Sequence, residues 1–200
     1  MKSLICNFEF ESNKAPGSKH MDLSIHYFVR IILIWLFCLL SVLLHELGHA
    51  LGYRISGGKA GWKVIVGSGP RLISISRFTF GLIPAGGNFV PAEEPKTDKG
   101  QIIMFAGGPF VSLLQAVLYW IIYFCIFRFV QPESSLCEIL LPVSSFLLYF
   151  NFFQFLFTAI PMRYRVICKG FESDGLQIVH ALKNTGSQES NMDHKSNPDD

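Results

Sequence analysis

Charged residues are scarce in this chain of 200 residues: Asp, Glu, Lys and Arg make up 16% of it, while hydrophobic types make up 50%. A soluble domain ordinarily carries about 25% charged residues, and the mean hydropathy here is +0.36. The composition therefore excludes an ordinary soluble domain and favours an integral membrane protein in a lipid bilayer. The net charge of +2, without a basic and aromatic patch, argues against a nucleic-acid partner.

Cysteine is also sparse, and its spacing excludes two further classes of protein. The five cysteines are widely scattered, and no two of them have CxxC spacing. The sequence therefore predicts neither a disulfide framework nor a thiolate zinc site. Cys38 and Cys125 lie in apolar runs, where a cysteine behaves as a small hydrophobic residue.

A removable signal peptide is not indicated, because the first two dozen residues are polar and no small-residue cleavage pattern follows the first apolar run. We expect residues 1–24 to form a polar tail and residues 25–183 to form the membrane core. The polar residues 184–200 predict a disordered C-terminal tail.

Three apolar runs predict three membrane-spanning helices, over about residues 27–52, 102–130 and 139–161. The first run, at 1.5 Å per residue, is roughly 39 Å long, which exceeds the ~30 Å hydrocarbon core of a bilayer. Gly107-Gly108-Pro109 falls in the first turns of the second run, where a missing proline N–H is tolerated. The predicted fold class is an α-helical integral membrane protein.

Residues 53–100 change character between the first two spans. Short β-type runs such as Val64-Ile65-Val66 alternate with glycine-rich turns such as Gly86-Gly87. We expect a small β-hairpin or sheet, part of it dipping toward the membrane. Backbone of this kind is tolerated at membrane depth only where protein or a water-filled cavity covers it.

The distribution of Lys and Arg predicts the orientation of the chain. Seven basic residues lie within 53–100 and several follow residue 161, whereas the turn at 131–138 has none. The positive-inside rule then places the 53–100 loop and the C-terminal tail in the cytoplasm. We expect a multi-pass protein of a bacterial cell membrane.

The sequence His45-Glu46-Leu47-Gly48-His49 ends the first apolar run. Two histidines four residues apart share one helix face and can bind one Zn²⁺, and Glu46 can act as a general base. Ionisable groups inside a membrane cost several kcal/mol unless they are paired or coordinated, so they indicate a functional site. The alternative is a chance match on a buried helix.

Polar residues at helical spacing extend this site to the other two predicted spans. Three sets share a face: Cys38, Ser41, His45 and Gly52; Ser112, Gln115 and Tyr119; and Asn151, Gln154 and Thr158. The three faces can converge on one polar cavity. Simple hydrogen bonds between helices are the alternative for each set.

A catalytic zinc usually has three protein ligands and one open position, so a third ligand is needed. The candidates near the predicted cytoplasmic side are Asp174, His180, Glu172, Glu93, Glu94 and Asp98. Asp174 follows the third span and precedes Gly175, which permits close backbone packing. An Asp at this position can instead be a helix N-cap.

These residues together resemble the site-2 proteases, intramembrane zinc metalloproteases of peptidase family M50. The resemblance covers roughly residues 27–182 and follows the family order. Four elements carry it: His45-Glu46-Leu47-Gly48-His49, Pro84-Ala85-Gly86-Gly87, Ala106-Gly107-Gly108-Pro109, and Asn151 with Pro161 and Ser173-Asp174-Gly175. The chain departs from the family pattern at Ser112, where Asn is common.

The resemblance implies a three-helix catalytic core that holds one Zn²⁺ per chain through His45, His49 and Asp174. Glu46 matches the catalytic glutamate. The Pro84–Gly87 element matches the segment thought to present an unwound substrate, so Gly86, Gly87, Asn88 and Asn151 are candidate substrate-binding residues.

The leading hypothesis is therefore an intramembrane zinc metalloendopeptidase of regulated intramembrane proteolysis. It would cleave transmembrane or membrane-associated peptide segments with zinc-activated water and Glu46 as the general base. The alternative is a non-catalytic, zinc-containing membrane scaffold or a peptide-binding or immunity protein. Retention of Glu46 argues against that alternative, because a structural zinc site needs no base. A transporter is disfavoured because the chain has no repeated halves.

Overall fold

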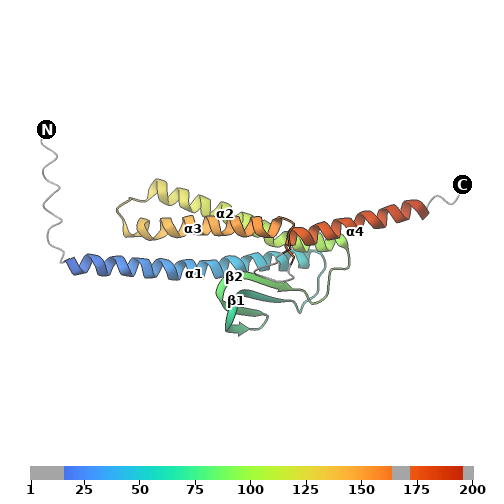
Figure 1. Cartoon of the computed structure of the whole chain (residues 1–200), viewed down its shortest axis with the longest axis horizontal. Helices are drawn as coiled ribbons and strands as arrows, with labels where there is room; N and C mark the ends of the chain where they lie inside the picture. Colours follow the sequence, from blue (N-terminus) through green and yellow to red (C-terminus); the bar gives the residue numbers. More distant parts are fainter. Residues whose placement is uncertain (1–15, 164–171, 196–200) are drawn as a thin grey trace.

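The structure, a computed structural model, describes residues 16–163 and 172–195. The element order is α1 (Pro16–Ile55), β1 (Lys63–Ile75), β2 (Phe78–Val90), α2 (Asp98–Phe129), α3 (Ser135–Ala159) and α4 (Asp174–Lys195). The helices α1, α2 and α3 run alongside one another, and α4 extends beyond the end of α3 (Figure 1). The predicted fold, mostly helical with a small hairpin between the first two spans, is confirmed.

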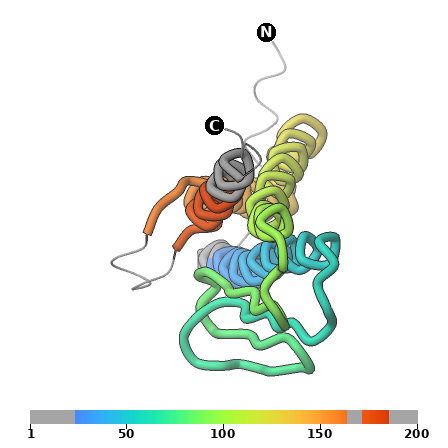
Figure 2. Tube along the Cα trace, turned by 90° about the vertical axis from the view of Figure 1, so that its right-hand side faces the viewer, coloured from blue at the N-terminus to red at the C-terminus, as the bar shows by residue number. Residues whose placement is uncertain are grey.

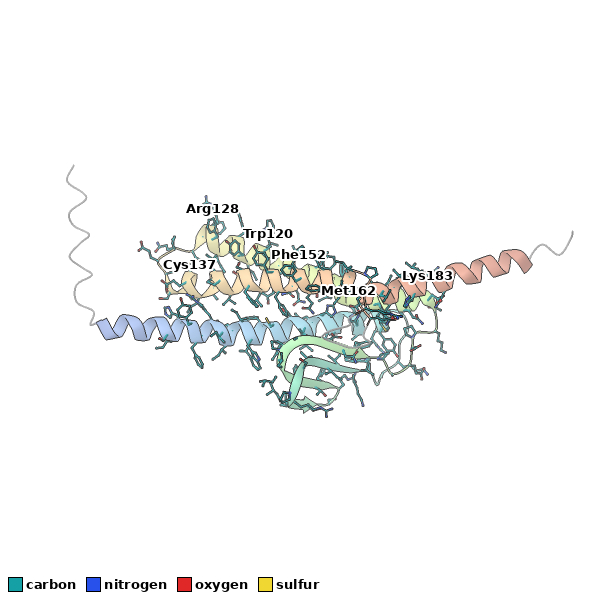
Figure 3. All side chains as sticks on the ribbon, viewed as in Figure 1. Trp120, Arg128, Cys137, Phe152, Met162 and Lys183 are labelled. Carbon is teal, nitrogen blue, oxygen red and sulfur yellow. The ribbon has the colours of Figure 1, made fainter. Side chains whose placement is uncertain are left out.

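Three helices are long and apolar enough to cross a membrane: Ser24–Ile55, Asp98–Phe129 and Ser135–Ala159. Large apolar side chains cover their outer faces, as at Trp120, which is 57% exposed, and Phe152, which is 42% exposed (Figure 3). Such surfaces are unfavourable in water but match the hydrocarbon of a bilayer. The burial pattern thus agrees with a membrane location.

Two of these helices begin four residues before their predicted starts, because polar capping residues precede the apolar runs. The Thr97 side chain accepts a hydrogen bond from the Gly100 amide at the start of α2. The Ser134 side chain accepts one from the Cys137 amide at the start of α3. Pro109 consequently lies inside α2, and the prediction that it falls in the first turns is wrong. It leaves the carbonyl of residue 105 without its usual helical donor.

The two terminal helices reach into the regions predicted as tails. α1 begins at Pro16, within the predicted tail 1–24, whose first fifteen residues lie outside the described part. α4 continues to Lys195, past residue 184, and residues 196–200 lie outside the described part. Its last three turns contain no apolar stripe, so hydrophobic periodicity gave no signal for a helix there.

The antiparallel hairpin β1–β2 packs against α1, on the side of that helix away from α2 and α4 (Figures 1 and 2). Val64 and Val66 are fully buried, and they form a core cluster with Leu39 and Val42 of α1. The indole of Trp35 donates a hydrogen bond to the Leu82 carbonyl at 2.8 Å. These contacts hold β2 beside the half of α1 that carries the histidines.

Glycines bring α1 and α2 into direct backbone contact. A Cβ placed on Gly48 would overlap the Gly107 carbonyl, and one on Gly52 would overlap the Ile103 carbonyl. Small residues at a helix crossing permit this close approach. The crossing places α2 directly over the histidines of α1.

Candidate metal centre

One buried stripe of α1 carries the metal-binding motif. Its members are small or polar and are nearly inaccessible: Cys38, Ser41, His45, Gly48, His49 and Gly52. The histidines are 3% and 5% exposed. Uncoordinated polar side chains are costly at this depth, so they require partners.

Asp174 brings the third donor atom to the two histidines. Its Oδ2 lies 3.5 Å from His45 Nε2 and 3.4 Å from His49 Nε2, and the two Nε2 atoms are 3.2 Å apart. Bonds of about 2.0–2.2 Å to a tetrahedral Zn²⁺ place the ligand atoms roughly 3.3–3.6 Å from one another. Within the described residues this is the one group of His, Cys, Asp or Glu side chains with such a spacing. The donor set and its spacing therefore fit zinc.

The other ring nitrogen of each histidine is held by α2. His49 Nδ1 lies 2.9 Å from the Met104 carbonyl oxygen, and His45 Nδ1 lies 2.8 Å from Ser112 Oγ. A carbonyl only accepts, so His49 carries its proton on Nδ1 and leaves the Nε2 lone pair free for a metal. Partners of this kind fix the ring orientation of metal-binding histidines.

Asp174 is the first residue of α4, which packs against α2. Its side chain is 17% exposed. Burial acts to raise the pKa of Asp174, but the neighbouring His49 and His45 outweigh that effect and hold the pKa at about 2. Asp174 is therefore a carboxylate at neutral pH, as a metal ligand must be.

Several other candidates for the third ligand have partners elsewhere. Lys59 pairs with Glu93 at 3.0 Å, and Arg163 pairs with Glu172 at 2.7 Å. His180 Nδ1 is 3.3 Å from Glu172, and the Asp98 carboxylate accepts a hydrogen bond from the Thr185 hydroxyl. These residues stay outside the His–His–Asp cluster.

Glu46 is a residue of α1 whose side chain faces β2, and it is only 4% exposed. A Cβ placed on Gly87 would overlap its carboxylate, and the backbone amide of Phe89 lies against it. Glu46 also interacts electrostatically with His49 and Asp174. The Glu46 carboxylate thus lies beside the His–His–Asp cluster and faces β2. A carboxylate in this place can exchange a proton with a group that lies between β2 and the cluster.

The residues predicted to bind substrate fall into two places. Gly86, Gly87 and Asn88 lie on β2 and are exposed, and Gly87 is the one that contacts Glu46. Asn151 is fully buried on α3, where its amide donates to Ser41 Oγ at 3.1 Å. Ser41 precedes His45 by one helical turn. A role of these four residues in binding substrate stays a prediction.

The polar faces of the three spans meet at Ser41. Gln115 Nε2 donates to the Ser41 carbonyl at 3.3 Å, and Asn151 binds the Ser41 hydroxyl. Hydrogen bonds between helices, the alternative considered for these residues, are therefore present. The amide oxygens of Gln115 and Asn151 are buried and lack a protein partner among the described residues. This leaves acceptor capacity for water next to the histidines.

Gly108 is a residue of the site that sequence reasoning missed. A Cβ placed there would overlap His49 Nε2 and would lie 2.7 Å from His45 Nε2. The Gly107-Gly108-Pro109 sequence was a signal for close helix packing, which Gly107 provides. No sequence pattern indicated that the adjacent glycine makes room for the candidate ligand atoms.

Three apolar helices, with a His–His–Asp cluster formed by α1 and α4, define a membrane protein with a candidate metal centre and an adjacent carboxylate. The family model for peptidase family M50 matches residues 33–195, and the chain belongs to this family. The matched range contains all the site residues described above. The resemblance to the site-2 proteases is confirmed, and membership identifies the chain as a membrane protease. No curated protein matches the chain.

Proposed function

We propose that this protein is an intramembrane zinc metalloendopeptidase that cleaves transmembrane or membrane-associated peptide segments. The observation that carries the proposal is the approach of three donor atoms, from His45, His49 and Asp174, to within 3.5 Å of one another. Structural zinc sites usually have four protein ligands, whereas three ligands leave a position for the reacting groups. The nearby Glu46 carboxylate supports a catalytic role over a scaffold.

His45, His49 and Asp174 would hold Zn²⁺, which when bound supplies Lewis-acid polarisation of a carbonyl and lowers the pKa of water. Glu46 takes a proton from the attacking water and delivers it to the leaving amine as the peptide C–N bond breaks. The buried Glu46 side chain faces β2, so its carboxylate stays close both to the water that loses the proton and to the amine that receives it. The products are a new carboxyl end and a new amino end.

The exposed segment of β2 next to Glu46 supports an extended substrate. Gly86 and Gly87 leave the strand without side chains beside the carboxylate. A peptide that adds to a strand presents its carbonyls through main-chain hydrogen bonds, independently of its side chains. A transmembrane substrate helix must therefore unwind locally before cleavage, and Asn151 is a further candidate contact for it.

The test compares the wild-type protein with Glu46→Gln and Asp174→Asn, purified in detergent and mixed with single-span membrane proteins. Glu46→Gln should keep one zinc per chain and reduce cleavage by about 10²–10⁴-fold, because general-base catalysis is lost. Asp174→Asn should lose zinc. Metal content is measured by elemental analysis and cleavage by mass spectrometry of the fragments.

Glu138→Gln is the matched control, because Glu138 is exposed near the opposite end of the bundle, where it pairs with His26. It should retain both zinc and activity. Substantial cleavage by Glu46→Gln would overturn the assigned mechanism. Full zinc in the wild type with no cleavage of any single-span protein would favour the scaffold alternative.

A further inference from the structure

The hydroxyl of Ser173, the residue before Asp174, uses its full hydrogen-bonding capacity. It donates to the Ile160 carbonyl at 2.8 Å. It accepts from the Met162 amide at 2.9 Å and from the Leu176 amide at 3.2 Å. A serine hydroxyl has one donor and two acceptor positions, so none remains, and Ser173 is only 2% exposed.

These bonds join the ends of two helices. The bond from Leu176 is the N-cap interaction that begins α4. The other two go to Ile160, the C-cap residue of α3, and to Met162, two residues further along the chain. The Ser173 amide also donates to the Met162 carbonyl at 2.9 Å. Met162 lies at the junction of α3 and α4 (Figure 3).

Contacts on either side of Ser173 restrain the same junction. A Cβ placed on Gly175 would overlap the Ala159 carbonyl, so α4 begins in backbone contact with the end of α3. On the other side, Arg163 and Glu172 form an isolated β-bridge and an ion pair at 2.7 Å. The backbone on both sides of Asp174 is therefore held next to the end of α3.

We propose that Ser173 is a positioning residue that holds the Asp174 carboxylate against the two histidines by fastening the start of α4 to the end of α3. This inference rests on the proposed function, because it takes Asp174 to be the third zinc ligand. An ordinary N-cap needs only the bond from Leu176. The two bonds to α3 have no part in capping, but they fix where the helix starts and so where its first side chain lies.

The test measures zinc affinity by competition with a chelator, using the full chain in detergent. Ser173→Ala should weaken zinc binding by about 10–100-fold, the effect typical of residues that orient a metal ligand. Ser173→Thr keeps the hydroxyl and should restore the wild-type affinity. The Co²⁺-loaded protein gives a second readout, since its visible absorption reports coordination geometry and should change in Ser173→Ala but not in Ser173→Thr.

Ser144→Ala is the matched control: Ser144 is 3% exposed, and its hydroxyl donates to the Leu141 carbonyl within α3 itself. It should bind zinc as the wild type does, and an equal loss there would overturn the proposal. Should Ser173→Ala not fold, Ser173→Cys, of similar size and with weaker hydrogen bonds, replaces it with the same expected results.

Asp174→Asn separates failure of this proposal from failure of the proposed function. Loss of zinc in Asp174→Asn with wild-type affinity in Ser173→Ala overturns the positioning role alone. Unchanged zinc binding in Asp174→Asn removes Asp174 from the ligand set, and both proposals then fail together.

Discussion

Each histidine of the candidate metal centre uses both of its ring nitrogens. The Nε2 atoms face Asp174, while the Nδ1 atoms are held by the Met104 carbonyl and the Ser112 hydroxyl. Neither Met104 nor Ser112 supplies a ligand, yet both lie on α2. The orientation of the donor atoms on α1 therefore depends on a helix that contributes no ligand of its own.

Gly108 allows α2 to approach the donor atoms, so we predict that Gly108→Ala abolishes tight zinc binding. The added methyl group would occupy the space of His49 Nε2 and crowd His45 Nε2, which turns the rings away from Asp174. Zinc content after purification measures the effect. Leu114→Ala, at a 52% exposed position of the same helix, is the control and should retain zinc. Stoichiometric zinc in Gly108→Ala would contradict the prediction.

Local spacing in the sequence predicts only part of the candidate ligand set. His45 and His49 are four apart on a helix, and that local spacing is sufficient to bring them together. Asp174 lies more than a hundred residues away. Its place after the third span and before Gly175 made it the best placed of six candidates, and the family resemblance then strengthened that assignment. Its distance to the histidines depends on how α4 packs, which no local pattern encodes.

At the scale of whole elements, the crossing of α1 and α2 depends on glycines that let the two backbones touch. Gly48 lies within the His45–His49 motif itself, between the two histidines in sequence. Helices in a bilayer gain no hydrophobic advantage from association, so close packing supplies much of their attraction. Gly48 thus belongs to the His45–His49 motif and also permits the close crossing of α1 and α2.

We predict that Gly48→Ala destabilises the fold by about 1–3 kcal/mol, the usual cost of overpacking a close contact. Its Cβ would overlap the Gly107 carbonyl and lie 2.9 Å from Val111 Cγ2, which forces the helices apart. The midpoint of thermal unfolding in detergent should fall. Leu51→Ala, at a 60% exposed position of α1, should leave the midpoint nearly unchanged. An unaltered midpoint for Gly48→Ala would show that the crossing tolerates wider spacing.

The existence of the helices could be predicted from the sequence better than their ends. Long apolar runs identified the three spans, but α2 and α3 start directly after the N-cap residues Thr97 and Ser134, among polar residues that hydropathy ignores. A Thr or Ser with an acidic residue soon after it is a capping signal that could have found both starts. The hairpin was expected from its β-type runs and glycines, whereas its docking on α1 depends on tertiary contacts.

The whole molecule has a direction, since α1 begins at one end of its long axis and α4 ends at the other (Figure 1). The three candidate spans lie alongside one another, and α4 continues beyond the end of α3. Basic residues gather in the 53–100 loop and after the third span, and the turn at 131–138 has none. The charge distribution favours a cytoplasmic location for the end that carries the hairpin, the metal centre and α4.

Labelling with a membrane-impermeant maleimide tests this orientation in intact cells. Lys59→Cys and Glu133→Cys are each introduced into a chain whose native cysteines have been replaced by serine. We expect the cysteine at 133 to be labelled from outside and the one at 59 to react only after the cells are opened. Both positions are exposed, so accessibility within the protein is matched. Labelling of position 59 in intact cells would reverse the orientation.

Asp174 is the first residue of α4, which follows the three candidate spans, and this has a consequence for how the enzyme is made. The two histidines enter the membrane early in synthesis, when the nascent chain offers only part of the ligand set. The site is completed after the third span has been inserted and the start of α4 has reached it. A nascent or truncated chain that ends before residue 174 therefore lacks the third donor of the candidate metal centre. Under the proposed function, the order of the elements delays proteolysis until the start of α4 has reached the histidines of α1.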